Sequence, residues 1–600
     1  MPPALLAALA LAACNEHGGS GPGRAAGGPR ATAPRDCAPD AGGLTLPAGF
    51  CATVFADSIG HARHLAVSPD GVVYVNTWSG KYYGNDKPPA GGFLVALRDT
   101  TGDGRADQIV RFGDSVPSGG AGGTGIALYH GSLYAEANDK IVRFPIASGA
   151  VAPSGAAEVI VQALPLTGDH PMHPIAIDSG GGLYIDLGSA TNACQLKNRI
   201  AGSLGHRPCT ELQSRGGIWR YDANRIGQHF SPAERYATGI RNADGIAVDA
   251  SGKTVYATQH GRDQLRENWP KLYTPEQGAN LPAEELLRVE KGGDYGWPEC
   301  YFDNTQQRLV LAPEYGGDGG HAVGPCGGKH APVAFFPAHW APLDLAFYGD
   351  TAFPAHYRGG AFIAFHGSWN RAPFPQQGYN VVFVPFSHGK PSGKYEIFAD
   401  GFAGGTKDPG QAAHRPAGVA VGADGALYVS DDVRGRIWRV TYHGNAAPAN
   451  QSGVASGDTG RAAAGRQSAA KPVEPPEGMN PNAGAPMPPP PTVPAGTPGV
   501  TMATVALGDS VYHGLAGGGT CVGCHGPDAR GTTLGPDLTD RQWLWGDGSL
   551  GSIERTIRDG VPTPKQHTGA MPAMGGAQLS AAQLRAVAAY VFASSRAGGK

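Results

Sequence analysis

Charged residues are scarce in this sequence, and no block of one charge sign stands out. Asp, Glu, Lys and Arg make up 16% of the 600 residues, and the formal net charge is −3 at pH 7. Without a Lys- or Arg-rich segment, the chain lacks the electrostatic footprint of a nucleic-acid-binding protein. The apolar run at residues 4–13 is too short to cross a bilayer as a helix. We therefore expect no nucleic-acid partner, and we interpret the apolar run as a signal peptide.

The signal peptide ends in a lipoprotein-like motif. Leu11-Ala12-Ala13-Cys14 resembles the site at which such signals are cut and the cysteine is acylated. We expect residues 1–14 to form this signal, Cys14 to carry the lipid anchor, and the protein to lie on the periplasmic side of a bacterial membrane. The alternative is an ordinary cleaved signal with an incidental cysteine.

The nine cysteines divide by context. One is Cys14, and two more belong to a Cys-x-x-Cys-His motif near the C-terminus. In an exported protein the other six are expected to be oxidised. Six cysteines allow 15 connectivities. Pairing neighbours along the chain predicts Cys37–Cys51, Cys194–Cys209 and Cys300–Cys326.

One pattern recurs six times between residues 44 and 443: two short apolar strands joined by a turn rich in Asp and Gly. Such a pattern predicts a β-hairpin. A further strand follows each hairpin, and four short strands per repeat make a propeller blade. We therefore predict an all-β, six-bladed β-propeller; a long sandwich or two stacked barrels are the alternatives. The copies begin at Leu65, Gly125, Ile175, Ile246, Leu345 and Val419.

The composition changes after residue 443. Residues 444–502 are rich in Pro, Gly and Ala and predict a linker, as residues 15–43 predict a flexible N-terminal segment. Residues 503–597 predict a small all-α cytochrome c domain, with one amphipathic helix near Leu550 and another after Leu579 that has Ser580 as its N-cap.

The haem motif of this domain is Cys521-Val522-Gly523-Cys524-His525. The two thiols are spaced to reach the two vinyl groups of haem c, and the next residue supplies an imidazole to the iron. A methionine is the usual second axial ligand of an electron carrier. Met571, in a Met-Pro dipeptide before the last helix, is the predicted ligand, and Met574 is the alternative.

Three segments of the propeller carry a family resemblance: Gly168-Asp169-His170, Arg241-Asn242-Ala243-Asp244-Gly245, and QHGRDQ from Gln259 followed by GGDYGWP from Gly292. With them, residues 46–442 resemble the soluble pyrroloquinoline quinone (PQQ) sugar dehydrogenases, including sorbosone dehydrogenase-like proteins. The resemblance implies that His170 is the catalytic base and that Arg241 and Asn242 face the quinone. It also implies that Arg371 and Arg415 are partners of the PQQ carboxylates.

The chemistry agrees with this assignment. Oxidation of a hydroxyl-bearing carbon needs a base, and histidine titrates near neutral pH. Asp169 could fix the tautomer of His170, and Arg241 could stabilise charge on the quinone. The resemblance further implies a calcium ion held by the main-chain carbonyls of Gly261 and Arg262. A second loop, residues 99–107, has calcium-like acidic spacing but is equally consistent with a plain turn.

These features together predict a PQQ-dependent dehydrogenase that oxidises a sugar or sugar aldehyde. Its electrons would pass through haem c to a periplasmic or membrane acceptor. Two alternatives come from other classes: a calcium-dependent, lactonase-like propeller hydrolase, and a non-catalytic propeller scaffold that carries an electron-transfer cytochrome.

Overall fold

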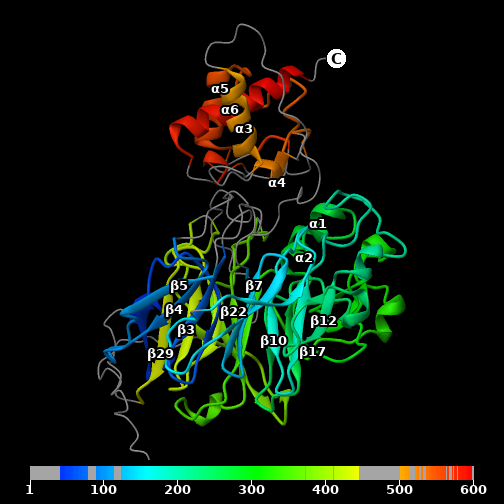
Figure 1. The fold of residues 1–600 in the computed structure, drawn as a ribbon. Helices are drawn as coiled ribbons and strands as arrows, with labels where there is room; N and C mark the ends of the chain where they lie inside the picture. Colours follow the sequence, from blue (N-terminus) through cyan, green and yellow to red (C-terminus); the bar gives the residue numbers. More distant parts are fainter. Residues whose placement is uncertain are drawn as a thin grey trace, which may run out of the picture.

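A computed structural model describes most of the chain outside its N-terminal segment and linker (Figure 1). The predicted signal peptide, the predicted anchor Cys14 and Cys37 lie outside the described residues, as does most of the predicted linker. The described residues are 41–78, 90–113, 123–153, 155–371, 373–409, 411–444, 500–513, 521–525, 529–531, 535–561, 564–566, 571, 573–576 and 579–597.

Six sheets of four or five strands form the propeller. The first blade contains β2 (His61–Val67), β3 (Val73–Trp78), β4 (Leu94–Arg98) and β5 (Gln108–Phe112), and the second contains β6 (Ile126–Tyr129), β7 (Ser132–Ala137), β8 (Lys140–Pro145), β9 (Glu158–Gln162) and β13 (Gln228–His229). The third contains β10 (Ile175–Ile177), β11 (Gly182–Leu187), β12 (Gly217–Asp222) and β14 (Arg235–Thr238), and the fourth contains β15 (Ile246–Val248), β16 (Val255–Gln259), β17 (Glu284–Val289) and β20 (Ala334–Phe336). The fifth contains β21 (Pro342–Phe347), β22 (Ala361–Phe365), β23 (Asn380–Val384) and β26 (Glu396–Ala399), and the sixth contains β27 (Pro416–Val421), β28 (Leu427–Asp431), β29 (Ile437–Tyr442) and β1 (Phe50–Ala56).

The first strand of each repeat lies nearest the axis. β2, β6, β10, β15, β21 and β27 each contact the first strands of both neighbouring blades, so they form a closed ring. Each of the six predicted hairpins supplies the first two strands of one blade. The six-bladed prediction is confirmed, and the sandwich and stacked-barrel alternatives are excluded.

The turn of the third repeat shows why the Asp-Gly pattern recurs. The Asp178 carboxylate accepts hydrogen bonds from the backbone N–H groups of Gly180 (2.9 Å) and Gly182 (2.7 Å). Gly181 has φ +84°, a backbone conformation that favours glycine. This turn therefore fixes the register in which β10 pairs with β11.

The first and last strands of the propeller sequence pair with each other and close the ring. β1 comes first in the chain but pairs with β29 of the last blade, from Phe50 opposite Tyr442 to Ala56 opposite Ile437. Phe50 is buried there against Phe353 and Phe398. The N-terminal strand therefore completes the sixth sheet.

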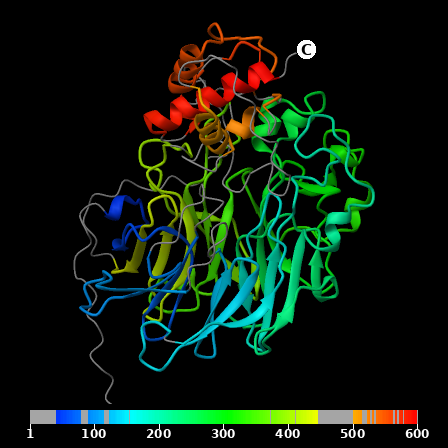
Figure 2. The same cartoon turned by 45° about the horizontal axis from the view of Figure 1, so that its top comes forward.

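The long insertion predicted to build a rim lies at one end of the propeller. It contains α1 (Leu265–Asn268) and α2 (Pro275–Asn280), which Figure 1 and Figure 2 place at that end, and the hairpin of β18 (Cys300–Asp303) and β19 (Arg308–Leu311). The predicted disulfides Cys194–Cys209 and Cys300–Cys326 are confirmed. Cys51 is disulfide-bonded, and its predicted partner is outside the described residues.

A small helical unit contains α3 (Met502–Tyr512), α4 (Cys521–His525), α5 (Leu550–Asp559) and α6 (Ala581–Ala597). It lies beyond the end of the propeller that carries α1 (Figure 1, Figure 2). The predicted cap of α6 is present, because the Ser580 hydroxyl accepts a bond from Gln583 N and the Gln583 amide accepts one from Ser580 N. α3 crosses α6 closely: a Cβ on Gly508 would lie 2.0 Å from Ala586 O. Within the described ranges, no helix has the length and apolarity needed to cross a bilayer.

Candidate active site and haem pocket

The insertion end of the propeller contains a polar cavity of about 620 Å³, part of which is open to solvent. Polar side chains from several blades and from the loops between them line it. Four are histidines, three are arginines and four carry carboxyl groups. The lining residues are Arg63, Asp169, His170, Met172, Arg241, Asn242, Asp244, His260, Gly261, Asp263, Glu284, His339, Ala341, Leu343, His366, Gly367, Trp369 and Arg415.

The His170 ring is held by Ser189, two residues after the end of β11. Its Nδ1 lies 2.9 Å from the backbone oxygen of Ser189 and 3.0 Å from the Ser189 hydroxyl. That hydroxyl donates its one hydrogen to Thr191 O at 2.7 Å, so it can only accept from His170. Nδ1 therefore carries the proton, and Nε2 is the basic nitrogen. Burial, followed by the nearby Arg241 and Arg199, lowers the pKa of His170 well below its ordinary value and keeps the ring neutral.

Asp169 does not hold this ring, which corrects its predicted role. Its carboxylate accepts bonds from Arg199 (Nε, 3.0 Å) and from the amide of Asn198 (3.2 Å). The Arg199 guanidinium is a stronger partner for a carboxylate than a neutral imidazole. Asp169 lines the cavity as one partner of an ion pair. Ser189, and not Asp169, fixes the tautomer of His170.

Arg241 and Asn242, the two residues predicted to face the quinone, both line the cavity. The guanidinium of Arg241 donates to Asp263 (2.7 Å), to Gly261 O (3.1 Å) and, through two nitrogens, to Asn192. Although burial opposes it, Arg241 and Arg199 hold the pKa of Asp263 below its ordinary range. Arg241 is therefore a fixed, buried cation at the cavity wall.

Arg415 and Arg371, the other two arginines predicted to bind the cofactor, differ in their position relative to the cavity. Arg415 lines the cavity and donates to the backbone oxygens of His366 and Gly367, both at 3.1 Å. Arg371 does not line it, which corrects its predicted role at the cofactor. Its guanidinium instead bonds Ala279 O and the Asn280 side chain at the end of α2, where helix carbonyls lack internal partners.

Sequence reasoning missed two arginines. Arg63 lines the cavity and pairs with Asp432 at 2.8 Å, and Asp432 also contacts His366 at 2.8 Å. Arg199 bridges Asp169 and Asp263 from a rim loop. No local motif marks either residue, because their partners lie far away in the chain.

Of the two predicted calcium ligands, Gly261 and Arg262, the structure places one at the cavity. Gly261 lines the cavity, whereas the Arg262 side chain pairs with the buried Glu314 and Arg262 is not among the lining residues. Gly261 N donates to Glu284 at 2.9 Å, and burial raises the pKa of Glu284 to about 8. The Gly261 carbonyl and the Glu284 and Asp263 carboxyl groups are oxygen donors of the type calcium prefers. The Gly261 carbonyl and the Asp263 carboxylate both accept hydrogen bonds from Arg241 here, so an ion held by these three groups would replace that guanidinium as their partner.

Two other acidic groups are structural. In the loop at residues 99–107, Asp99 and Asp107 accept bonds from their own loop, including Gly102 N to Asp99 at 2.7 Å and Thr101 N to Asp107 at 3.1 Å. This is the plain-turn alternative.

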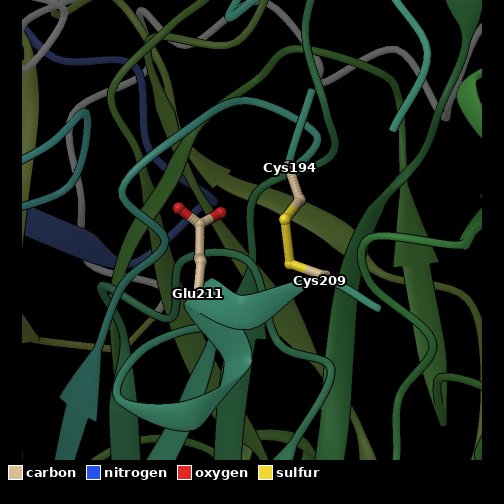
Figure 3. A group of neighbouring side chains, drawn as sticks. All are labelled: Cys194, Cys209 and Glu211. Carbon is tan, nitrogen blue, oxygen red and sulfur yellow. A yellow bond between two sulfur atoms is a disulfide. The ribbon is translucent and has the colours of Figure 1, made fainter. Parts of the chain in front are cut away.

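Within the described part of the chain, the cluster of side chains that could in principle bind a metal is Cys194, Cys209 and Glu211. Figure 3 shows that its two sulfur atoms are joined as a disulfide. Their thiolates are therefore unavailable to a metal.

The helical unit encloses a pocket of about 980 Å³ lined mainly by apolar side chains. Cys521, Cys524, His525 and Met571 all line it, whereas Met574 does not. His525 Nδ1 bonds Pro536 O at 2.9 Å, which assigns Nε2 as the nitrogen for iron. Gly535 is needed beside this ring, since a Cβ there would lie 3.0 Å from it.

The pocket fits haem c. Two thiols stand at one wall, with an imidazole and a thioether in the same cavity. Among the described lining residues the only ammonium or guanidinium group belongs to Lys565, whose Nζ lies over the Trp545 ring at 4.3 Å. Among those residues, Lys565 is therefore the cation that would be available to a haem propionate.

Both the propeller and the helical unit match families of known proteins. A family model described as TrAA12-like matches residues 122–443, more than half of the chain, and one described as cytochrome c oxidase, cbb3-type, subunit III, matches residues 503–591. A PQQ-dependent pyranose dehydrogenase of Coprinopsis cinerea is 27% identical over 234 residues, covering 33% of this chain and 30% of that protein. A cbb3-type oxidase subunit FixP of Bradyrhizobium is 43% identical over 77 residues, covering 12% of this chain and 26% of that protein. The chain therefore spans less than half of the length of these curated relatives.

Solved structures show the same propeller fold. The Trichoderma reesei family AA12 enzyme superimposes with a TM-score of 0.53 at 19% identity, covering 67% of this chain and 98% of that one. The holo PQQ domain of the Coprinopsis cinerea pyranose dehydrogenase gives 0.52 at 19% identity, covering 68% and 98%. The C-terminal unit matches a cytochrome c domain and is similar to the cbb3-type subunit III, and the chain belongs to the TrAA12-like family.

Proposed function

We propose that the protein is a PQQ-dependent dehydrogenase of a sugar or sugar aldehyde, with haem c as the electron exit to an external acceptor. The observation that carries this proposal is one cavity in which the basic nitrogen of a neutral histidine, His170, is assigned by Ser189 and stands among the fixed cations Arg241, Arg63 and Arg415. The activity named for the Coprinopsis cinerea relative supports the same class.

His170 Nε2 accepts the proton of the substrate hydroxyl as the carbon is oxidised. When bound, PQQ supplies the acceptor for the hydride that leaves this carbon. Arg241, locked by Asp263 and Asn192, presents positive charge where negative charge develops, without having to reorganise. Arg63 and Arg415 also line the cavity and are the other cations that would pair with the cofactor carboxylates.

Calcium, the anchor and the location complete the proposal. A calcium ion near Gly261 and Glu284 would add positive charge at the same wall of the cavity, and one of the solved relatives is described as a calcium structure. A lipid anchor at Cys14 would hold the enzyme on the periplasmic side of the membrane. A linker at residues 444–502 would let the haem unit meet a periplasmic or membrane acceptor.

Reconstitution tests the proposal. The haem-loaded apoprotein is incubated with PQQ and calcium, aldoses and sugar aldehydes are added, and the reduced haem α-band is followed. We expect substrate-dependent reduction that requires PQQ. Reduction that is absent with every substrate, or complete without PQQ, would overturn the proposal. Lactone hydrolysis without PQQ would favour a hydrolase instead.

His170→Ala separates the proposed base from the rest of the chain. This variant should lose haem reduction by substrate while dithionite still reduces its haem. His356→Ala is the control, because His356 lies on the surface and contacts Glu396 at 2.9 Å, away from the cavity lining. Unchanged substrate turnover in His170→Ala would exclude His170 as the base.

A further inference from the structure

We propose that an exposed apolar tip on the loop between Cys194 and Cys209 is the docking site of the chain's own haem unit. The apolar tip is the side chains of Leu196, Ile200 and Leu204. The inference rests on the proposed function, because docking serves electron transfer between the two units.

The tip is apolar, exposed and preorganised. Leu196, Ile200 and Leu204 are 59%, 44% and 56% exposed, and they fall within nine positions of the chain. Exposed apolar side chains that gather in one place mark interaction sites. The loop is closed by the Cys194–Cys209 disulfide, and Leu196 N donates to Leu204 O at 2.8 Å, so these two side chains are carried on one small hairpin.

The same loop is ion-paired to the cavity wall. Arg199, immediately before Ile200, places its guanidinium 2.9 Å from Asp169 and 3.2 Å from Asp263, and both of these carboxylates line the cavity. The loop therefore has an outer apolar surface and an inner ion-paired surface. A redox unit seated on the tip would be separated from the cavity by this one loop.

The loop also lies at the correct end of the molecule. Gly202 N donates to Asn268 O of α1 at 2.8 Å. Figure 1 and Figure 2 both place the helical unit beyond the end of the propeller that carries α1. The haem unit therefore lies beyond the same end of the propeller as the apolar tip.

The haem unit also exposes large apolar side chains. Met502, Leu507 and Trp545 are its exposed large apolar side chains among the described residues, and Trp545 also lines the haem pocket. Apolar contact through Trp545 would bring the edge of the haem pocket to the tip. A patch of three side chains is too small for a stable complex between separate proteins. Within one chain, tethering raises the effective concentration, so a small and transient contact is sufficient.

The experiment uses the full-length holoenzyme with haem, PQQ and calcium. Stopped-flow absorbance measures haem reduction after substrate is added, and a small-molecule electron acceptor separately measures turnover in the propeller. Leu196→Glu/Leu204→Glu should slow haem reduction at least tenfold and leave turnover with the small acceptor unchanged. Ile200→Glu, as a second variant, should act in the same direction.

Ile109→Glu is the matched control. Ile109 is 54% exposed on β5 and lies outside the loop, so this substitution should change neither rate. Wild-type haem reduction should be independent of protein concentration. Normal haem reduction in the tip variants would overturn the proposal, and a rate that rises with protein concentration would assign the tip to a second copy. Failure of the proposed function is distinguishable, because the wild type would then show no turnover even with the small acceptor.

Discussion

Ser189 presents two hydrogen-bond acceptors to one nitrogen of His170: its backbone oxygen at 2.9 Å and its hydroxyl at 3.0 Å from Nδ1. Both partners are neutral, so the ring is oriented without an ion pair. The tautomer follows from the direction of the Ser189 hydroxyl, whose hydrogen goes to Thr191 O. A histidine held in this way remains a base in mildly acidic solution.

Replacing Ser189 tests that relationship through pH dependence. His170 must be neutral to accept a proton, and its pKa lies well below the ordinary value of 6.5, so the acid limb of kcat/KM in the wild type should lie below pH 6.5. Ser189→Asp puts a carboxylate against Nδ1 and should move this limb to higher pH. The charged and titratable groups facing His170, namely Arg241, Arg199, His260 and Asp263, are unchanged in this variant.

Ser189→Ala and Ser189→Thr complete that series. Loss of one neutral hydrogen bond costs about 1 kcal/mol, so Ser189→Ala should lower kcat/KM by roughly fivefold without moving the acid limb upward. Ser189→Thr retains the hydroxyl and should recover part of the loss. An acid limb that is identical in all three variants would show that Ser189 does not tune the base.

Asp263→Asn should destabilise the propeller, because it leaves Arg241 and Arg199 buried without their shared carboxylate. Removing one partner of a buried ion pair costs about 3–5 kcal/mol in free energy of unfolding. The pKa of Asp263 is lowered in the folded state, so its contribution is present at neutral pH and is lost as pH falls below about 4. Denaturant titrations at neutral and acidic pH measure both effects.

Asp57→Asn is the control for that measurement. Asp57 pairs with Arg436 on the surface at 3.0 Å, and an exposed pair contributes about 0–1 kcal/mol. A loss in Asp263→Asn no larger than the loss in Asp57→Asn would contradict the structural role assigned to Asp263.

Met571→Ala should remove the second axial ligand of the haem iron. Met571 lines the haem pocket and is positioned by two backbone hydrogen bonds with Val561. Loss of the thioether should lower the reduction potential and change the visible spectrum. Met574→Ala is the natural control, since Met574 packs against the helical core outside the pocket lining. The reverse pattern in a redox titration would assign the ligand to Met574.

Glu284→Gln should weaken the response to calcium. Burial raises the pKa of Glu284 to about 8, so a bound cation would favour its ionised form. We expect chelation to reduce PQQ reconstitution of the wild type, and the variant to need at least tenfold more calcium for half-maximal recovery. Recovery curves that coincide for Glu284→Gln and the wild type would remove Glu284 from the calcium site.

Local signals predicted most of the fold. The Asp-Gly turns identified the first two strands of each blade, and the Ser580 cap located the start of α6. The position of β1 was not predictable in this way, because its partner β29 lies at the other end of the propeller sequence. α3 was also missed; its burial depends on a close crossing with α6 that no local periodicity reveals.

In the candidate site, too, the residues in local motifs were predictable and their distant partners were not. His170, Arg241, Asn242, Gly261 and Arg415 lie in recognisable segments, and all of them line the cavity. Their partners were less accessible to sequence reasoning. Ser189 follows an ordinary blade strand, and Arg199 lies in an insertion whose path is set by a disulfide and by carboxylates more than twenty residues away.

The pairing of β1 with β29 also affects how the molecule is made. Until the last blade has been synthesised, β1 has no partner and the sixth sheet cannot be completed, so the nascent propeller exposes unpaired strand edges. The seam joins segments separated by nearly the whole propeller sequence, a slow type of contact to form. Residues 444–502 lie between this seam and the haem unit, so the toroid becomes able to shut before the polypeptide that receives the haem has been synthesised.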